Sequence, residues 1–302
     1  MNAFTRCGVL AIAGLGWACA AAQTMTSLQQ DASTVTVTQG GRILMRYRHG
    51  YVPYKPYVEV LCTPSGVNVI RDAPADHLHH HGLMFAITAG GVNFWEEAKA
   101  PGEQKHVSLE PIPDPALSGF MERIDWNTSK DGAALMHETR TLWTVNDDTL
   151  GAVILHWQTN LQPAKAMAAK GVELTGTNYH GLGLRFLASM DRTDGFFNAN
   201  GDKGVAGTHE QRSPWCAFTG YAEGSPVTIA LFDHPSNPRH PATWFTMHTA
   251  FSYMSVTLNL HKELLLLTES GIELKYGIGL WDGTQNLETV EKGYRRWLEL
   301  AE

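Results

Sequence analysis

Segments in which apolar and polar residues alternate recur along most of the chain. A period of two places successive side chains on opposite faces of a strand, so each segment predicts a β-strand. The segments cover residues 34–38, 42–47, 57–62, 66–70, 83–88, 92–95, 134–145, 152–161, 173–176, 181–190, 226–233, 243–248, 253–260, 263–267 and 272–281. Glycine and proline between many of them are typical of turns.

The order of these segments indicates the fold class. Residues 134–145 and 152–161 flank the turn-forming sequence NDDTLG, which predicts a β-hairpin. Strands do not alternate with helices, which disfavours a parallel sheet. Many strands separated by turns predict an all-β fold, a large antiparallel β-sandwich. Because the chain shows no linker, repeat or low-complexity tract, we expect a single domain over residues 26–302.

One stretch near the C-terminus has helical periodicity instead. Between residues 284 and 300, apolar side chains recur at helical spacing, and Thr284 or Asn286 is a candidate N-cap. We therefore expect a C-terminal α-helix that packs across the sheet.

The first residues have the features of an export signal. Arg6 precedes the apolar run 7–20, and small residues follow it, which predicts a signal peptide over residues 1–22 with cleavage before Gln23. No other apolar run reaches the roughly 18 residues of a membrane span. We expect a periplasmic or secreted protein. The net charge of −7 gives no basic field, so we expect no nucleic-acid partner.

Two of the four cysteines lie in that predicted leader. Cys62 and Cys216 remain, and an oxidising compartment permits a disulfide between them. Two separate buried thiols are the alternative, and the sequence leaves the choice open.

The sequence DHLHHHGLMF, residues 76–85, contains four histidines within five positions. If a strand begins near residue 77, His77, His79 and His81 point to one side and His80 to the other. Alternate histidines on one strand are able to share a metal ion, and neutral imidazole carries protons near pH 7. A structural cluster bonded to backbone carbonyls is the third alternative.

The next predicted strand places further polar groups beside the histidines. Asn93, Trp95 and Glu96 lie on this segment. An aromatic ring, an amide and a carboxylate next to imidazoles are the groups of a polar ligand pocket.

A second candidate region is NYHGLGLRF, residues 178–186. Tyr179 and His180 precede a strand in which Arg185 stands among glycine, leucine and phenylalanine. An arginine in apolar surroundings needs an anionic partner, either a carboxylate of the protein or a ligand.

A third candidate region is FDHPSNPRHPATWF, residues 232–245. Three prolines restrain a loop that carries Asp233, His234, Asn237, Arg239 and His240. Restrained polar loops suit binding sites. A crossover loop whose polar groups bond its own backbone is the alternative.

Several enzyme classes are disfavoured by missing motifs. The sequence has no Gly-x-Ser-x-Gly elbow and no His-Glu-x-x-His helix. No glycine-rich phosphate loop joins a strand to a helix. Serine hydrolases of that type, zincins and nucleotide enzymes are therefore not expected.

The three regions together resemble a bacterial family labelled "methane oxygenase PmoA", or PmoA-like. The family pattern Asp-His-Pro-His-His-Arg-Gly-Leu-Trp-Phe, followed by Asn-Gly-Val-x-Phe-Trp, is similar to DHLHHHGLMF and GGVNFW here. Its block Tyr-x-Gly-Leu-Gly-x-Arg is similar to YHGLGLRF, and Asp-His-Pro-x-Asn-Pro-Arg-His-Pro is similar to DHPSNPRHP. The similarity extends from about residue 51 to residue 283.

Some positions depart from this pattern. His81 stands where the family has arginine, so a permanent cation is replaced by a titratable one. Leu78 and Met84 replace a proline and a tryptophan. A membrane oxygenase subunit needs spanning helices, which this sequence does not predict, so we regard the label as a misnomer. The resemblance implies a large β-sandwich of the general shape of galactose mutarotase-like sugar enzymes.

Three functional hypotheses follow. The first is an exported carbohydrate-active enzyme, an epimerase, lyase or hydrolase, acting without a cofactor on a small-molecule or oligosaccharide substrate. Its expected catalytic residues are His79, His80, His234 and His240. Its expected substrate-binding residues are Asn93, Trp95, Glu96, Tyr179, His180, Arg185, Asn237 and Arg239. The second is a metal-dependent enzyme whose divalent metal is bound by His79, His81 and His234, and the third is a non-catalytic sugar-binding module.

Overall fold

The computed structural model describes residues 26–301 with the exception of residues 53, 115–116 and 261–264. The predicted signal peptide lies outside the described residues. In the part of the chain that is described, no helix is long and apolar enough to cross a bilayer.

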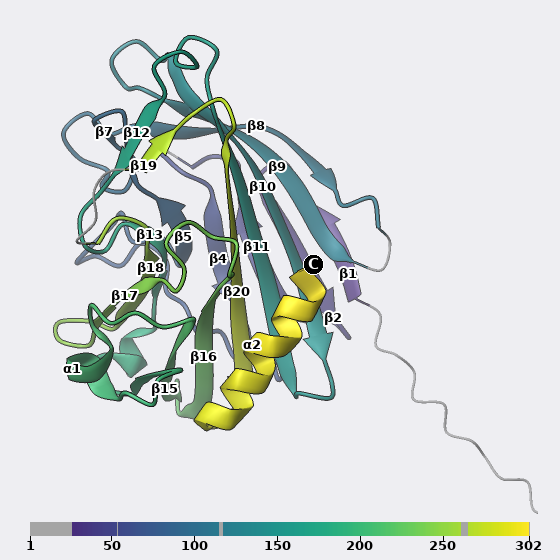
Figure 1. Ribbon diagram of the computed structural model, residues 1–302. Coiled ribbons are helices and arrows are strands. Elements are labelled where there is room, and N and C mark those ends of the chain that lie inside the picture. The colour runs from purple at the N-terminus through teal and green to yellow at the C-terminus, as the bar shows by residue number, and fades with distance from the viewer. Residues whose placement is uncertain (1–25, 53, 115–116, 261–264, 302) are drawn as a thin grey trace, which may run out of the picture.

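Two eight-stranded sheets form most of the molecule (Figure 1). The first sheet has, in spatial order, β1 (Thr26–Gln30), β2 (Thr34–Gln39), β3 (Arg42–Arg48), β4 (Tyr57–Leu61), β5 (Leu83–Ala86), β13 (Gly181–Arg185), β18 (Tyr253–Thr257) and β17 (Thr243–Met247). The second sheet has β14 (Phe196–Asn198), β15 (Trp215–Ala222), β16 (Ser225–Asp233), β20 (Ile272–Asp282), β11 (Ala152–Pro163), β10 (Ala134–Asp147), β9 (Ser118–Asn127) and β8 (Glu103–Pro111).

Shorter elements complete the fold. A third, four-stranded sheet consists of β19 (Leu265–Leu267), β12 (Val172–Thr175), β6 (Thr88–Ala89) and β7 (Val92–Asn93). The helical elements are η1 (Ala188–Met190), α1 (Gly204–Thr208) and α2 (Leu287–Ala301). The pairing of β10 with β11 is antiparallel and confirms the predicted hairpin. The prediction of an all-β antiparallel sandwich with a C-terminal helix is confirmed.

The main core lies between the two large sheets. On β2, Val35 and Val37 are fully buried while their neighbours are partly exposed, as the alternation predicts. On β5, Leu83 and Phe85 belong to the same core. The alternate residues of β5 point the other way, into a separate aromatic cluster on the outer face of the first sheet. The first sheet therefore has two apolar faces, and its outer face is available for a site.

Helix α2 covers the outer face of the second sheet (Figure 1). Its buried side chains Val290, Tyr294 and Trp297 share one apolar stripe. The Asn286 side chain accepts a hydrogen bond of 2.9 Å from the Thr289 amide, so Asn286 is the cap. A Cβ atom on Gly277 would lie 2.7 Å from the Trp297 ring, so glycine there permits the helix to approach the sheet.

A buried ionic network joins the two sheets across the core. Arg140 of β10 donates hydrogen bonds of 2.8 and 2.9 Å to the two oxygens of Glu138 and one of 2.9 Å to the Tyr47 hydroxyl. Tyr47 of β3 in turn donates to Glu122 of β9. Because these buried groups are charge-paired and hydrogen-bonded to one another, the network has a structural role.

Two local predictions fail. Residues 66–70 form isolated bridges, Cys62 with Asn68 and Ile70 with Phe186, in place of a strand. The segment 92–95 leaves the sheet after Asn93, because the Asn93 side chain accepts the Trp95 and Glu96 amide protons and closes a turn.

The two cysteines in the described part of the chain do not pair. Cys62 and Cys216 are both buried and free, so the alternative of separate thiols is the observed one. Burial raises the pKa of Cys62 to about 11, which makes its thiol unreactive at neutral pH.

Candidate functional site

The histidine-rich segment lines a cavity on the outer face of the first sheet. The cavity has a volume of about 490 Å³, within the usual range for small-molecule sites. It is lined by His77, His79, His80, Trp95, Glu96, Tyr179, Phe245, Met247, Ala250, Phe251 and Tyr253. Strands β17 and β18 supply the floor, and the loops before β5 and β13 and after β7 supply the walls.

Residues 74–80 form successive turns, so the predicted strand near residue 77 is wrong. The His77 amide donates to the Pro74 carbonyl at 2.9 Å, and the His80 amide donates to the His77 carbonyl at 3.0 Å. These turns gather three imidazoles that a strand would have separated. The ring centroids of His77 and His80 lie 4.6 Å apart, and those of His79 and His80 lie 4.7 Å apart.

His80 is held in a defined protonation state by Arg185. Its Nδ1 atom lies 3.2 Å from Nη1 of the guanidinium. Because a guanidinium only donates, Nδ1 must be the acceptor, and the proton of the neutral ring is on Nε2. Burial, with the neighbouring charges, lowers the pKa of His80 to about 2. His80 is therefore a hydrogen-bond donor to the cavity through Nε2 and does not serve as a base at neutral pH.

Arg185 bonds a carboxylate on one side and is covered by an aromatic ring on the other. It donates to Asp76 at 2.8 Å, and its Cζ atom lies 3.6 Å from the centroid of the Phe251 ring. Of the two partners that the sequence allowed, a protein carboxylate or an anionic ligand, the structure supplies the carboxylate.

His79 is the imidazole best placed to accept a proton. It is partly exposed at the cavity, and its ring centroid lies 5.1 Å from that of Trp95. Burial, followed by the charge of Lys55, lowers the pKa of His79 below its ordinary value. The ring is therefore neutral at pH 7 and retains a basic nitrogen.

Trp95 is the central aromatic side chain of the cavity. Its indole stacks on His180 at 5.5 Å with an interplanar angle of 11°, and its centroid lies 4.7 Å from that of Tyr179. Both ring nitrogens of His180 are buried without a hydrogen-bond partner in the described part of the chain. Burial lowers the pKa of His180 to about 4, so this ring supports the indole as a neutral group.

Glu96 presents a carboxylate to the cavity. Its Oε1 atom accepts a hydrogen bond of 2.9 Å from the Tyr179 hydroxyl, and Oε2 accepts one of 3.3 Å from the Asn93 amide. Each oxygen keeps a further lone pair that is able to accept a hydrogen bond from a ligand hydroxyl group.

His81 is turned away from the other histidines into an ionic network. Its Nδ1 and Nε2 atoms lie 2.8 and 2.9 Å from Asp72 and Glu97. Burial opposes the charged ring, but the two carboxylates outweigh it and raise the pKa of His81. Lys55 bonds the same Glu97 oxygen at 2.5 Å. His81 thus acts as a cation that fixes the loop, and both of its nitrogens are occupied.

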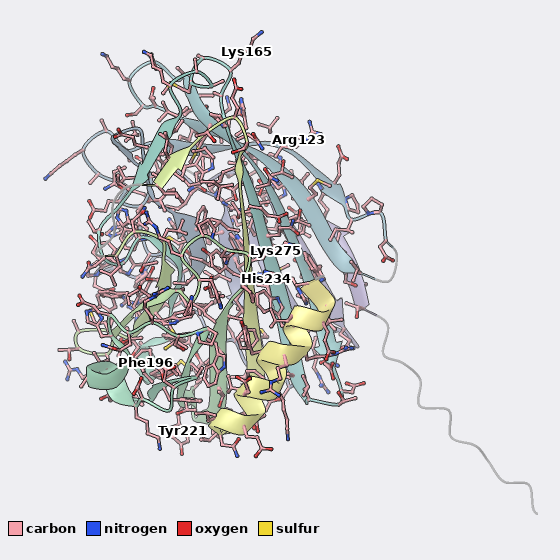
Figure 2. All side chains as sticks on the ribbon, in the orientation of Figure 1. Arg123, Lys165, Phe196, Tyr221, His234 and Lys275 are labelled. Atoms are coloured by element: carbon pink, nitrogen blue, oxygen red, sulfur yellow. The ribbon has the colours of Figure 1, made fainter. Side chains whose placement is uncertain are left out.

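The proposed metal triad is not assembled. His81 is engaged as described, and His234 lies beside α2 (Figure 2), with its ring centroid 5.6 Å from that of Trp297. Among the described residues, no three histidine, cysteine, aspartate or glutamate side chains are grouped to hold one metal ion.

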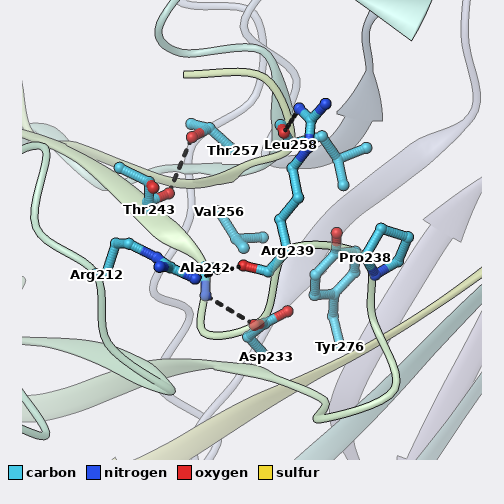
Figure 3. Close-up of a pocket in the computed structure, with 10 residues that line it drawn as sticks. All are labelled: Arg212, Asp233, Pro238, Arg239, Ala242, Thr243, Val256, Thr257, Leu258 and Tyr276. Atoms are coloured by element: carbon cyan, nitrogen blue, oxygen red, sulfur yellow. Dashed lines mark hydrogen bonds between the residues drawn. The ribbon is translucent and has the colours of Figure 1, made fainter. Parts of the chain in front are cut away.

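The proline-containing loop, residues 233–242, is separate from the histidine cavity. The cavity that Asp233 and Arg239 line is about 10 Å³ and shares no residue with the histidine cavity (Figure 3). The expected pairing of His79 and His80 with His240 across one pocket is therefore not observed. The physical reason is that this loop crosses from β16 to β17 at the edge of the sandwich.

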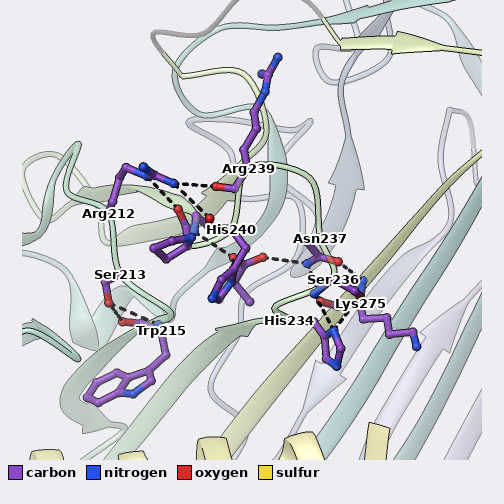
Figure 4. A network of polar contacts seen from close by, with 12 residues as sticks. Arg212, Ser213, Trp215, His234, Ser236, Asn237, Arg239, His240 and Lys275 are labelled. Atoms are coloured by element: carbon purple, nitrogen blue, oxygen red, sulfur yellow. Dashed lines mark hydrogen bonds and ion pairs between the residues drawn. The ribbon is translucent and has the colours of Figure 1, made fainter. Parts of the chain in front are cut away.

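Polar groups of this loop bond the loop itself (Figure 4). Asp233 accepts hydrogen bonds from the Asn237 amide at 2.8 Å, His240 Nδ1 at 2.7 Å and the Ala242 amide at 2.9 Å. His234 Nδ1 lies 2.7 Å from the Ser236 hydroxyl.

Residues outside the loop complete these bonds. Arg212 donates to the carbonyls of Pro241 and Arg239 at 3.0 and 3.1 Å. Arg239 donates to the Leu258 carbonyl at 2.7 Å. The alternative of a crossover loop that ties down its own backbone describes what is seen.

The predicted residues thus divide into three groups. Five line the histidine cavity, three contact a lining residue, and four lie in the proline-containing loop. The lining residues are His79, His80, Trp95, Glu96 and Tyr179; the contacting residues are Asn93, His180 and Arg185; those in the loop are His234, Asn237, Arg239 and His240.

Sequence reasoning missed the floor of the cavity. Phe245 and Met247 alternate with the buried Trp244 on β17, and Tyr253 begins β18. The alternation itself shows that these side chains face away from the main core. It does not show that a cavity lies over them.

A larger surface hollow of about 590 Å³ lies near the start of α2, beside Asp194, Lys203 and Asn286. Its lining contains no histidine, and Asp194 and Asn286 are used to bond backbone amides. The concentration of imidazoles, aromatic rings and one carboxylate makes the histidine cavity the candidate functional site.

The fold and the cavity define an antiparallel β-sandwich protein with a cavity of about 490 Å³ on the outer face of one sheet. Residues 34–295 match the model described as "Family of unknown function (DUF6807)", and the chain belongs to this family. No curated protein matches the chain. Among solved structures, it is similar to the alpha-galactosidase from Lactobacillus brevis, with 8% identity and a TM-score of 0.39. That match covers 88% of this chain but only 40% of the enzyme's chain.

Proposed function

We propose that this protein is a carbohydrate-active enzyme whose substrate binds in the histidine cavity. The observation that carries the proposal is the combination of partly exposed aromatic rings, Tyr179 and Phe245, with imidazoles and a carboxylate in one cavity. Apolar sugar faces stack on aromatic rings, while sugar hydroxyls need both donors and acceptors. The proposal includes export to the periplasm or the medium, directed by residues 1–22.

The geometry suggests a distinct role for each group. His79 acts as general base, because it is neutral and partly accessible. His80 donates a hydrogen bond from Nε2 to a substrate oxygen and stabilises negative charge that develops there. The partly exposed rings of Tyr179 and Phe245 stack on the sugar, and the buried Trp95 supports Tyr179 from behind. Glu96 accepts hydrogen bonds from sugar hydroxyl groups.

The single carboxylate favours some reactions over others. Most glycoside hydrolases use two carboxylates on opposite sides of the bond. Among the described residues lining the cavity, Glu96 is the one acidic side chain. A reaction initiated by proton transfer to His79, such as epimerisation or elimination, therefore suits the cavity better than hydrolysis.

A binding experiment tests the location of the site. We expect titration with a panel of monosaccharides and disaccharides to quench the fluorescence of Trp95, and Trp95→Ala to weaken binding at least about tenfold. Trp143→Ala is the matched control, because Trp143 is a partly buried tryptophan on the second sheet. Unchanged affinity in Trp95→Ala, or no sugar bound by the wild-type protein, would contradict the proposal.

A turnover experiment separates the enzyme from a sugar-binding module. If the cavity only binds sugar, the wild-type protein will convert none of the sugars that it binds. If the protein is an enzyme, His79→Gln will lose turnover while the affinity for the sugar is kept. Stoichiometric metal in protein purified without an affinity tag, together with activity lost to a chelator, would favour the metal-dependent alternative instead.

A further inference from the structure

The charges around the histidine cavity are arranged unevenly. Of its eleven lining residues, Glu96 is the one that is an aspartate, glutamate, lysine or arginine. Its carboxylate is supported by two neutral donors, the Tyr179 hydroxyl and the Asn93 amide. No arginine or lysine bonds this carboxylate in the described part of the chain, so Glu96 presents an uncompensated negative charge.

The two nearby cations lie behind the residues that line the cavity. Arg185 is 1% exposed, bonds Asp76 and lies beneath the Phe251 ring. Lys55 is also 1% exposed and bonds Glu97. Each basic side chain is thus bonded to a carboxylate, and neither is among the residues that line the cavity.

Two of the three imidazoles that line the cavity do not supply the missing positive charge, and the third, His77, lies 3.2 Å from the Asp76 carboxylate. Burial lowers the pKa of His79 and of His80, so both rings are neutral at pH 7. Protein sites that recognise carboxylates or phosphates normally present arginine, lysine or clustered backbone amides. This cavity presents aromatic faces, neutral imidazoles and one carboxylate.

We propose that the histidine cavity selects uncharged sugars and excludes sugars that carry a carboxylate or phosphate group. This specificity rests on the proposed function. Glu96 is the residue that sets this selectivity. It accepts hydrogen bonds from the hydroxyl groups of a neutral sugar and repels an anionic sugar. The Asp76–Arg185 pair is the second determinant, because Asp76 cancels the nearest cation behind the cavity wall.

Binding of matched methyl glycosides tests this selection. The pairs are galactose with galacturonate, glucose with glucuronate, and mannose with mannuronate, measured by calorimetry at pH 7. We expect the neutral member of the preferred pair to bind at least about tenfold more tightly than its uronate, because like charges brought together without water are strongly unfavourable.

Two variants assign the effect to named residues. Glu96→Gln keeps the size of the side chain and removes its charge, so it should reduce the preference for the neutral sugar at least about threefold. Asp76→Asn leaves the charge of Arg185 uncompensated and should also reduce the preference for the neutral sugar over its uronate. Glu110→Gln, an exposed glutamate on β8, is the matched control and should preserve the wild-type ratio.

The outcomes are distinguishable. Uronate binding as tight as neutral binding, or a preference unchanged in Glu96→Gln, overturns the charge selection while the carbohydrate function stands. If neither member of any pair binds, the proposed function fails, and the inference fails with it. A neutral preference that is reduced in both variants and retained in the control supports both.

Discussion

The histidine cavity and the proline-containing loop contain the same kinds of residue but use them differently. Histidine, arginine and aspartate occur in both regions, and the sequence suggested that they face each other in one pocket. In the proline-containing loop, Asp233 alone receives three hydrogen bonds from within the loop. In the histidine cavity, His79, His80 and Glu96 line open space.

The difference lies in how the polar groups are satisfied. A polar loop that bonds its own backbone stabilises a crossover and has little capacity left for a ligand. The histidine loop also has structural hydrogen bonds, but His81 and Arg185, which do not line the cavity, make them. The residues that line the cavity are therefore available to a substrate.

The largest effect of a substitution is expected at His79, and its absence would remove the difference between the two regions. His79→Gln should reduce turnover of the identified sugar by about 10²–10⁴-fold, because general base catalysis typically contributes that much. Steady-state kinetics checks this, with thermal melting to confirm the fold. Exposed His137 on β10 provides the matched control, His137→Gln. A turnover in His79→Gln within about twofold of the wild type would remove His79 from the mechanism.

The corresponding substitution in the proline-containing loop should act on stability. Asp233→Ala removes the acceptor of three donors, two of them buried, so we expect the free energy of unfolding to fall by about 3–5 kcal/mol. Denaturant titration measures it, with exposed Glu110→Ala as a control. Sugar affinity of the folded variant should remain that of the wild type. A stable variant with lost affinity would instead place this loop in the site.

The third prediction concerns acid stability. His80 is neutral in the folded protein because its pKa is lowered to about 2, whereas the unfolded residue protonates near its ordinary value. The unfolding free energy therefore loses nothing at His80 above about pH 6.5. It declines as the pH falls from there towards 2, because only the unfolded state binds the proton. Between pH 6 and 4, His80→Gln should show a shallower loss of unfolding free energy, by up to about 1.4 kcal/mol per pH unit. Equal slopes in denaturant titrations would contradict a neutral, buried His80.

The smallest effect is expected at Leu78, which lies between the histidines but is 65% exposed. Leu78→Ala should change the unfolding free energy by less than about 0.5 kcal/mol and leave sugar affinity unaltered. The same titrations provide the measurement. A large effect on affinity would mean that the ligand extends over the outside of the histidine loop.

The sequence predicted much of the fold because strand periodicity is a local property. The strands β2, β10 and β11 and helix α2 follow directly from apolar spacing. Residues 66–70 share that spacing but are not a strand, because pairing depends on which backbone lies alongside. The turns at 74–80 were also missed, since histidine has no strong preference that distinguishes a turn from a strand.

The site was predicted in part for a related reason. Residue types indicated polar chemistry in three regions, and two of these, around His80 and Arg185, meet in the structure. The third region does not join them, because alternation along a strand says nothing about which loops meet in space. The ionic partners of His81 were likewise hidden, since Asp72 and Glu97 lie 9 and 16 residues away from it in the sequence.

Histidine-selective nuclear magnetic resonance during a sugar titration tests the central claim most directly. It observes the rings of both regions in one sample. The account predicts that the ring resonances of His79 and His80 shift with saturation, that His80 shows the Nε2–H tautomer, and that His234 and His240 stay unchanged. Shifts at His234 and His240 with none at His79 and His80 would contradict it.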